Sequence, residues 1–465
     1  MGRPAVARSR PRLQRSTIGK GTVCFLDFFA YVHGSLRHDA DAADQDDQRR
    51  EATMRRPQDT SSPTTCTPYS KMVSLIGILL LTVAVARAQE IDPTSYLAKI
   101  SAPSYHVADV WTNFRPSQNH DEIVKAAPDT WEVLPKAFDK NYRNPCWTDA
   151  SGRFRCAPYF QIIGVSKCGT TDLYGRLTRH PDMAEGAKGP HFWDECPYPP
   201  KGACTAPPNG DFDGYINLFE KGASVIRTNP LAIVGEASSN TYTGTFTFVR
   251  GLARLKTNVT LAQLIYEAQP YQRQVIIMRD PVSRYYSAFH YYRRRPTDPF
   301  DGPDKFHERV ERDIKLWTTC EQRYGVAECV KRYEPQQLVK GMYSEFVDAW
   351  TSVFPREQLL FLRTEDYKAA PREHIQAVIK FLGMRDLSDE ETTTMMRLRR
   401  FNAQSEKYPR MWPQSRKMLE DFYRPFNQKL AKLMGDDPRF LWEDTAKKAA
   451  AGAAVAGGGA GLDRQ

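Results

Sequence analysis

The sequence predicts one α/β domain, in which helices flank a parallel, P-loop-like β-sheet, between two ends that are not expected to fold. Two patterns predict this class. Between residues 151 and 445, short apolar runs that end in polar residues alternate with helical segments, as strands and crossover helices do in parallel sheets. The first apolar run leads into a turn with glycines and then into a helix, which is typical of phosphate-binding α/β domains.

The expected strands are four apolar runs. They cover residues 160–165 (FQIIGV), 231–238 (LAIVGEAS), 274–280 (QVIIMRD) and 358–367 (QLLFLRTEDY). Apolar residues at helical spacing predict helices at residues 172–180, 261–268, 284–295, 372–383 and 416–435. Ligands of such folds bind outside the carboxyl ends of the strands. We therefore expect the functional residues where each run turns polar.

The remainder of the 465-residue chain divides by composition. Residues 1–71 are rich in Arg, Asp, Ser and Pro, so we expect them to be disordered. Residues 89–150 are interpreted as a stem, residues 151–445 as the folded domain, and residues 446–465 as a low-complexity tail.

An apolar segment at residues 72–88 predicts entry into the secretory pathway. Its uncharged part, Met72 to Ala86, has 15 residues between Lys71 and Arg87, whereas a membrane span usually needs about 20. It is either a short signal-anchor or, because Ala86-Arg87-Ala88 fits a cleavage site, a signal peptide. A buried soluble helix is the third alternative, and the polar flanks on both sides disfavour it.

Six of the cysteines after this segment form couples close in sequence. The couples are Cys146 with Cys156, Cys196 with Cys204, and Cys320 with Cys329. In an oxidising lumen we expect these as local disulfides, although spacing alone does not prove which cysteines pair. Metal binding is the alternative, but no CxxC pair or clustered histidines support it. The Asn-Val-Thr triplet at Asn258 is an expected glycosylation site.

The turn after the first strand has the composition of an anion site. Gly164 and Gly169 allow the backbone to curl so that N–H groups between them point inward. The helix that begins near Thr170 adds the positive end of its dipole. Thr170 and Thr171 supply hydroxyls, and Lys167 supplies a charge. A Walker loop requires Gly-Lys-Ser/Thr in sequence. This turn reads Lys-Cys-Gly-Thr-Thr, so a nucleoside-triphosphate kinase is disfavoured.

A second anion site is expected at the end of the run at residues 274–280. Arg279 closes that run and Ser287 follows eight residues later, about two helical turns on. Arg279 is suited to a bidentate pair with a phosphate, and Ser287 can donate to the same group. Two anion sites at neighbouring strand ends suggest a ligand phosphorylated at two separate positions.

Together the two motifs carry a specific resemblance. GxxKxGTT after a strand, followed by strand-RDPxxRxxS, resembles the signatures of sulfotransferases that use 3′-phosphoadenosine 5′-phosphosulfate (PAPS). The similarity spans roughly residues 145–445 and is strongest to the Golgi glycosaminoglycan enzymes, particularly those that sulfate the 6-hydroxyl of N-acetylgalactosamine 4-sulfate. The supporting segments are residues 180–193, 234–242 and 421–442.

The resemblance implies roles for the motif residues. Lys167 would stabilise the bridging oxygen as the sulfuryl group leaves. The other donor-binding residues would be Cys168, Gly169, Thr170, Thr171, Arg279 and Ser287. The reaction would need no metal and no covalent enzyme intermediate, and the expected partner is a sulfated glycosaminoglycan, not nucleic acid.

The general base is the open question of the resemblance. Related heparan enzymes carry a glutamate two positions before the His of the motif, and this chain has Gly189 there. His191 is the nearest candidate base, against the alternative of a structural histidine. Glu185 and Glu236 are held in reserve, and Glu236 and Lys188 are expected acceptor contacts.

The basic balance of the chain agrees with an anionic partner. There are 65 Lys and Arg against 55 Asp and Glu, a formal net charge of +10. Such an excess suits nucleic acid, a membrane surface, a nucleotide or an acidic polysaccharide, and equally a merely solvated surface. The resemblance selects the polysaccharide and implies a Golgi enzyme with a lumenal domain. A non-catalytic polysaccharide-binding relative remains an alternative, and the oligomeric state stays open.

Overall fold

A five-stranded parallel sheet forms the centre of the structure. The computed structural model describes residues 92–195, 210–244, 259–292, 302–398, 408–443 and 445. The sheet order is β4 (Ala187–Lys188), β5 (Gly235–Ala237), β3 (Phe160–Gly164), β6 (Arg273–Met278) and β7 (Leu359–Arg363). Each neighbouring pair is parallel.

The helical elements surround this sheet. In chain order they are η1 (Leu97–Lys99), α3 (Val107–Asn113), α4 (His120–Ala126), α5 (Pro128–Val133), α6 (Thr170–Leu177), α7 (Phe192–Glu195), α8 (Phe212–Asn217), α9 (Glu220–Thr228), α11 (Leu261–Ala268), α12 (Pro281–Tyr291), α13 (Pro303–Arg332), α14 (Gln336–Val339), α15 (Ser344–Thr351), η3 (Arg356–Gln358), α16 (Thr364–Ala369), α17 (Pro371–Phe381), α18 (Asp389–Met396), α19 (Pro413–Leu433) and η5 (Pro438–Leu441). A separate two-stranded ribbon pairs β1 (Cys146–Thr148) with β2 (Phe154–Cys156) in antiparallel fashion.

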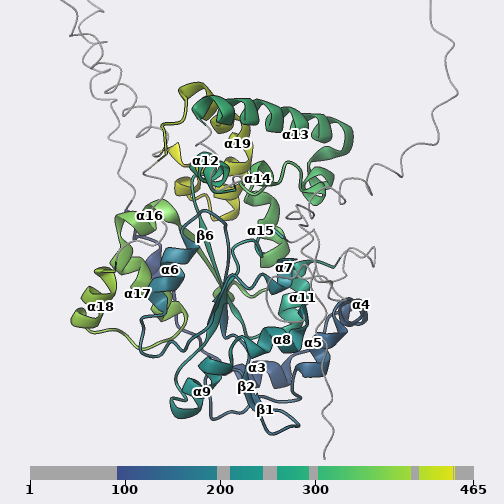
Figure 1. The fold of residues 1–465 in the computed structure, drawn as a ribbon, viewed down its shortest axis with the longest axis vertical. Coiled ribbons are helices and arrows are strands. Elements are labelled where there is room, and N and C mark those ends of the chain that lie inside the picture. Colours follow the sequence, from purple (N-terminus) through teal and green to yellow (C-terminus); the bar gives the residue numbers. More distant parts are fainter. Residues whose placement is uncertain are drawn as a thin grey trace, which may run out of the picture. The chain divides into compact units, whose positions relative to one another are not determined.

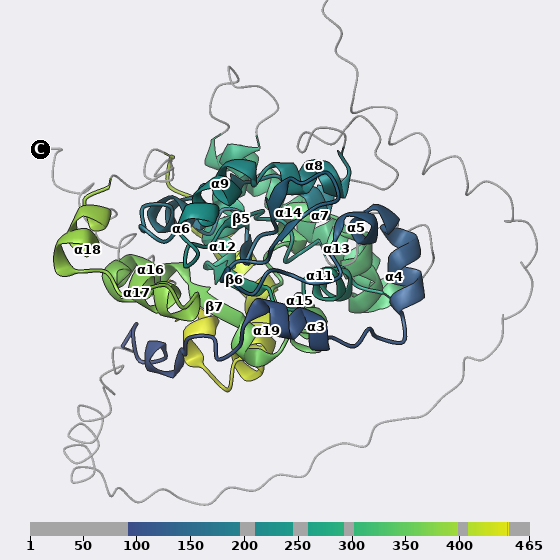
Figure 2. The ribbon, with the colours of Figure 1, turned by 90° about the horizontal axis from the view of Figure 1, so that it is seen from below.

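The helices form a layer on each face of the sheet. Figure 1 shows α6, α16 and α17 on one side and α7, α11 and α15 on the other. The view from below in Figure 2 separates the same two groups. Because both faces are covered, all residues of β3, β6 and β7 are buried, which is why these strands carry apolar runs instead of an alternating pattern. The predicted α/β class with a parallel sheet is confirmed.

Every predicted strand is present, but the observed strands are shorter than the predicted runs. Each of the four apolar runs contains a strand, but only residues 235–237 of the run 231–238 pair as β5. The run 358–367 divides, since its polar end begins α16. Strand β4 is an addition that the sequence did not predict, because two residues carry no periodic signal.

Helix α13 is also absent from the sequence prediction. It runs over 30 residues, and Gly325 interrupts it with a φ of +77°. In its first half the buried residues Phe306, Val310 and Trp317 recur at helical spacing, but many charged residues stand between them and make this stripe narrow. The disulfide between Cys320 and Cys329 spans the glycine.

The segment interpreted as a stem packs against the domain. Val107, Ile123 and Trp147 belong to the same buried hydrophobic cluster as the sheet, and the Tyr105 hydroxyl donates to the carbonyl oxygen of Tyr271 over 3.1 Å. Scattered aromatic residues supply these contacts, so no periodic sequence pattern predicted that this segment packs against the domain.

Several predictions fall on residues that the structure does not describe. The described residues pair Cys146 with Cys156 and Cys320 with Cys329. Cys196, Cys204 and Asn258 lie outside them, as do residues 1–71, the apolar segment 72–88 and the tail from residue 446. None of the helices in the described part of the chain is both long enough and apolar enough to cross a membrane.

We predict that Gly186→Ala destabilises the edge of the sheet. A Cβ at Gly186 would lie 2.0 Å from the backbone oxygen of Gly235, so β4 cannot keep its place beside β5. We expect a loss of about 3 kcal/mol in the free energy of unfolding, measured by urea denaturation. Gly302→Ala is the control, since its Cβ meets only the side chain of Asp304 and should change stability by less than about 1 kcal/mol. Equal losses would contradict the prediction.

Candidate active site

A cavity of about 790 Å³ opens at the carboxyl ends of the central strands. It collects residues from the loops after β3, β4, β5, β6 and β7. Its lining includes Lys167, Cys168, Gly169, Thr170, Thr171, Lys188, Gly189, His191, Glu195, Asn240, Arg279, Ser287, Tyr291 and Thr364. Both sequence motifs therefore face one space, as expected for a parallel sheet.

The turn between β3 and α6 is tightly held. Lys167 and Gly169 have φ values of +69° and +99°, and the N–H of Cys168 donates to the carbonyl oxygen of Val165 over 3.1 Å. The hydroxyl of Thr364 lies 2.6 Å from the carbonyl oxygen of Cys168. Since the first N–H groups of α6 have no acceptor within the helix, this turn presents donors and a helix N-terminus to the cavity.

Lys167 stands at the centre of this turn. Its ammonium nitrogen lies 3.4 Å from the ring centroid of Tyr291, a cation–π contact. Burial, together with the charges of Arg279 and Arg284, lowers the pKa of Lys167 to about 8. The ammonium therefore remains mostly protonated at neutral pH, and an anion in the cavity would raise its pKa again.

The second motif reaches the same turn from the neighbouring strand. One guanidinium nitrogen of Arg279 donates to the carbonyl oxygen of Lys167 over 3.4 Å, and the hydroxyl of Tyr343 donates to the carbonyl oxygen of Arg279 over 2.8 Å. Ser287 is buried on α12. Arg284, on the same helix, is fully buried and donates to the backbone oxygen of Gln337.

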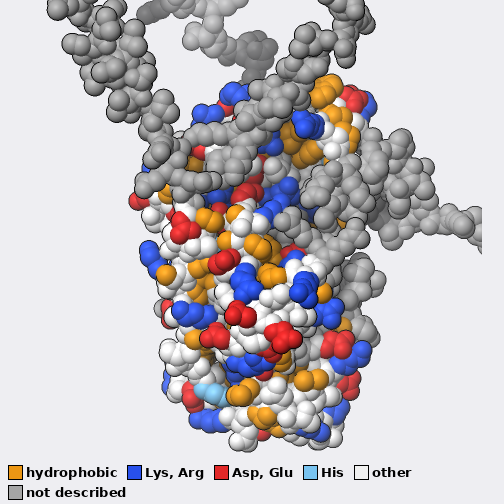
Figure 3. Space-filling view, turned by 90° about the vertical axis from the view of Figure 1, so that its left-hand side faces the viewer, with side chains coloured by type: hydrophobic (Ala, Val, Ile, Leu, Met, Phe, Trp, Pro, Cys, Tyr) orange, Lys and Arg blue, Asp and Glu red, His pale blue; other side chains and the backbone are white. Residues whose placement is uncertain are grey.

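In the described part of the chain these cations are not paired with carboxylates. Among the described residues, no ion pair joins Lys167, Arg279 or Arg284 to a carboxylate. Arg284 is fully buried, and Lys167 and Arg279 are half-buried. Removing charge from water without a counter-ion is costly, so this arrangement favours an anionic ligand with more than one charged group. On the face drawn in Figure 3, Lys and Arg side chains are interspersed with Asp and Glu.

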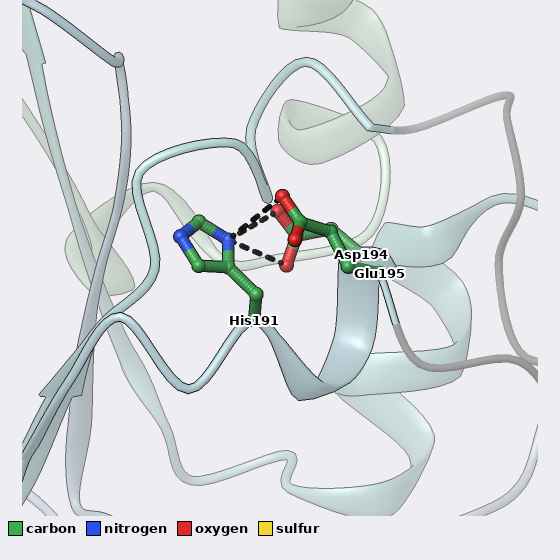
Figure 4. Close-up of side chains that lie close together, drawn as sticks. All are labelled: His191, Asp194 and Glu195. Carbon is green, nitrogen blue, oxygen red and sulfur yellow. Dashed lines mark hydrogen bonds and ion pairs between the residues drawn. The ribbon is translucent and has the colours of Figure 1, made fainter. Parts of the chain in front are cut away.

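His191 faces the cavity from the side of β4 and β5. Its Nδ1 lies 3.1 Å from a carboxylate oxygen of Asp194 and 3.5 Å from one of Glu195. Since a carboxylate can only accept, Nδ1 carries the proton and neutral His191 has its lone pair on Nε2. Figure 4 shows this second ring nitrogen on the side of the ring away from both carboxylates.

The acidic neighbours set the proton affinity of His191. Burial lowers its pKa, but the hydrogen bond and charge of Asp194, with the charges of Glu195 and Glu236, outweigh burial and hold the pKa above its ordinary value. A Cβ at Gly189 would lie 3.7 Å from Nε2. Gly189, where the related heparan enzymes carry a glutamate, therefore lies next to Nε2, the imidazole nitrogen that can accept a proton.

Glu236 and Lys188 support this region in different ways. Glu236 is fully buried and does not line the cavity. It accepts a hydrogen bond of 2.7 Å from Ser238, whose hydroxyl oxygen accepts from the backbone N–H of His191. Burial raises the pKa of Glu236 to about 7. The ammonium of Lys188 donates to the carbonyl oxygen of Ala237 over 3.1 Å, and the partial loss of water around the ammonium in this contact lowers its pKa.

The sequence did not single out several residues of the site. Tyr291, Thr364, Asn240 and Ser238 take part through contacts between separate loops, and no motif marked their roles. Cys168 is a free, buried cysteine, and burial raises the pKa of its thiol to about 11. This thiol is therefore unionised at neutral pH. Cys168 contributes to the turn through its backbone N–H and carbonyl groups.

One group of described residues is close enough to share a metal ion. The ligand atoms of His191, Asp194 and Glu195 lie within 4.8 Å of one another. Hydrogen bonds already occupy them, because Nδ1 donates to Asp194 and Glu195 accepts from Asn240 over 2.9 Å. We therefore describe this group as a hydrogen-bonded cluster.

Comparison with known proteins decides the family. The profile of the sulfotransferase domain matches residues 158–430, which contain both strand-end motifs. The chain belongs to the sulfotransferase family, a family of enzymes. This confirms the resemblance drawn from the two motifs and the fold that it implied.

Individual relatives agree with this assignment. Carbohydrate sulfotransferase 15 of Homo sapiens is 33% identical over 343 residues, which cover 68% of this chain and 58% of that protein. The bifunctional heparan sulfate N-deacetylase/N-sulfotransferase 3 of Homo sapiens is 25% identical over 347 residues, covering 70% of this chain and 36% of that protein. The match thus spans less than two thirds of the length of these curated relatives. A sulfotransferase structure from Alicyclobacillus acidocaldarius is 26% identical, with a TM-score of 0.39 over 60% of this chain and 96% of that one.

Proposed function

We propose that this enzyme transfers the sulfuryl group of PAPS to a sugar hydroxyl of a glycosaminoglycan. The preferred acceptor in this proposal is the 6-hydroxyl of N-acetylgalactosamine 4-sulfate in chondroitin or dermatan sulfate. One observation carries the donor half: Lys167, Arg279 and Ser287 line a single cavity, and its half-buried cations Lys167 and Arg279 lack carboxylate partners in the described chain. The similarity to carbohydrate sulfotransferase 15 supports a carbohydrate acceptor.

The donor half assigns each strand-end loop to one anionic group. Thr170, Thr171 and the turn backbone at Cys168 and Gly169 bind the 5′-phosphate through hydroxyls, N–H groups and the end of α6. Arg279 and Ser287 bind the 3′-phosphate. Lys167 leaves the ring of Tyr291 to neutralise the bridging oxygen on which negative charge develops, an electrostatic role.

The acceptor half needs a base. The sugar hydroxyl oxygen attacks sulfur while the bond from sulfur to the bridging oxygen breaks, and adenosine 3′,5′-bisphosphate (PAP) leaves. In our proposal the hydroxyl proton passes to Nε2 of His191, and Asp194 stabilises the resulting imidazolium through Nδ1–H. Lys188 steers the anionic acceptor into the cleft. Glu236 positions the loop that carries His191, because it accepts a hydrogen bond from Ser238, which in turn accepts from the backbone N–H of His191.

We place this activity in the lumen of the Golgi. The disulfides Cys146–Cys156 and Cys320–Cys329 suit an oxidising compartment. The apolar segment at residues 72–88 then serves as a single-pass signal-anchor, or alternatively as a cleaved signal peptide. We also retain the expectation of N-glycosylation at Asn258.

Two rival functions remain open to test. A kinase would use a nucleoside triphosphate, and a polysaccharide-binding relative would bind PAPS and glycosaminoglycan without transfer. Incubation of the purified protein with ³⁵S-labelled PAPS and a panel of chondroitins separates them. Label on chondroitin supports our proposal, whereas intact PAPS binding with no transfer to any acceptor supports the binding protein.

Lys167→Ala should abolish most transfer. We expect a fall in kcat of about 100-fold or more, because the charge that stabilises the leaving oxygen is gone. PAP affinity, measured by calorimetry, should fall much less. Lys380→Ala is the matched control, since Lys380 lies exposed on α17 outside the cavity. A variant with wild-type kcat would refute the role of Lys167.

His191→Gln tests the base through the pH profile. Only neutral His191 accepts a proton, so kcat/KM of the wild type should fall as the pH drops through the pKa of His191, which lies above its ordinary value. The variant should lose about 100-fold in kcat/KM and also lose this acid limb. His307→Gln, on α13, is the control. An unchanged acid limb in His191→Gln would remove the assignment.

A further inference from the structure

Lys340 is a buried lysine that the proposed chemistry does not use. It directly follows α14, and the residue is 3% exposed. No carboxylate of the described chain lies within ion-pair distance of its ammonium. Burying a lysine in this way is costly, and an apolar side chain of similar length would fill the same space. The charge therefore points to a function other than packing.

The ammonium of Lys340 makes one directed contact toward the cavity. It donates a hydrogen bond of 2.9 Å to the side-chain oxygen of Asn240, and the ring centroid of Tyr333 lies 5.8 Å away. Because an ammonium can only donate, this bond decides which end of the Asn240 amide faces Lys340. The amide NH₂ group must then face the opposite direction, toward the cavity wall that Asn240 helps to line.

The NH₂ group of Asn240 meets Glu195. It donates to a carboxylate oxygen of Glu195 over 2.9 Å. That carboxylate lies 3.5 Å from Nδ1 of His191, beside Asp194, as Figure 4 shows. Helix α7 places Glu195 one turn after His191, and because its side chain is 51% accessible, the Asn240 amide is the described side-chain donor that restrains the carboxylate beside the imidazole. The contacts thus form a continuous path from Lys340 through Asn240 and Glu195 to His191.

We infer that Lys340 is a positioning residue for the acceptor side of the site: through Asn240 it holds Glu195 against His191 and so fixes the orientation and proton affinity of the imidazole. This inference rests on the proposed function insofar as it concerns transfer. The arrangement of the contacts, however, can be tested without any turnover.

The surrounding charges are consistent with this role. Arg284 of α12 and the carboxylates Asp194 and Glu195 of α7 act on Lys340. Burial and Arg284 lower the pKa of Lys340 to about 8, while the two carboxylates raise it, so the group stays mostly protonated at neutral pH and keeps donating. The charged groups that face His191 are Asp194, Glu195 and Glu236. Removing Glu195 from this set should therefore lower the pKa of His191.

The test compares Lys340→Met with Lys340→Arg and with Lys380→Met as the exposed control. Lys340→Met cannot orient Asn240, so we expect kcat for sulfate transfer to fall about 10-fold, with the KM for PAPS and the affinity for PAP unchanged. The acid limb of the pH profile should move to lower pH, because Glu195 no longer faces His191. Lys340→Arg, which still donates, should recover most of the rate.

A second variant protects the test against misfolding. Asn240→Leu breaks the same path without touching Lys340 and should reproduce both effects. In the double variant Lys340→Met/Asn240→Leu the loss should not exceed that of either single change, since both act through one path. Additive losses, or an acid limb that stays in place while the rate falls, would show that Lys340 has only a structural role.

Proton NMR titration of His191 keeps this inference separate from the proposed function. The His191 signal is identified by its loss in His191→Gln. Its titration midpoint should fall in Lys340→Met and in Asn240→Leu, and stay at the wild-type value in Lys380→Met. A wild-type protein without transfer activity but with these shifts would overturn the proposed function and support the positioning path. Unchanged midpoints would overturn the path even in an active enzyme.

Discussion

A cluster of half-buried and buried cations that has no carboxylate partner among the described residues is the constraint on which this structure depends. Lys167, Arg279 and Arg284 come together where two neighbouring strands end, and none has a carboxylate partner among the described residues. In an isolated domain such a cluster opposes folding. It becomes favourable when an anion with several charged groups enters, so the free energy of folding and the specificity for the donor are linked through the same side chains.

The scaffold holds this cluster with backbone contacts instead of carboxylates. The hydroxyl of Thr364, at the start of α16, lies 2.6 Å and 2.8 Å from the carbonyl oxygens of Cys168 and Met278. The hydroxyl of Tyr343 donates to the carbonyl oxygen of Arg279. Neutral donors fix the two motif loops without neutralising their charge. A carboxylate in either position would compete with the donor phosphates.

The acceptor side follows the opposite rule. Asp194, Glu195 and Glu236 surround His191 and favour its protonated form, as a group that receives a proton requires. The two halves of the cavity therefore differ in charge: cations are left unpaired beside the expected phosphates, and carboxylates gather around the expected base. Lys340 lies near the carboxylates, yet it contacts them only through the neutral amide of Asn240.

Local sequence was enough to predict the parts of the fold that repeat a local pattern. The apolar run before Gly164 gave β3, the glycine turn gave the start of α6, and the segment Leu261–Ala268 was predicted with the bounds that α11 has. Strand β4 was beyond reach because its pairing with β5 depends on a contact between backbones. Helix α13 was missed because its apolar stripe, Phe306, Val310 and Trp317, is narrow and stands among many charged residues.

The site divides in the same way. The two motifs could be located from sequence because each is compact and each follows a strand. The Asn240–Lys340 contact could not, since it joins residues 100 positions apart that share no motif. The cation–π contact of Lys167 with Tyr291 likewise depends on how α12 packs against the turn. Tertiary packing decides this, so local sequence could not predict it.

The most direct test of the account compares two ligands that differ by one phosphate. Calorimetry should show that PAP binds about 10-fold or more tightly than adenosine 5′-monophosphate, because only PAP occupies both anion sites. Arg279→Ala should remove most of that advantage and leave the affinity for the monophosphate nearly unchanged. Equal affinities in the wild type, or an equal loss for both ligands in Arg279→Ala, would contradict the two-site cavity.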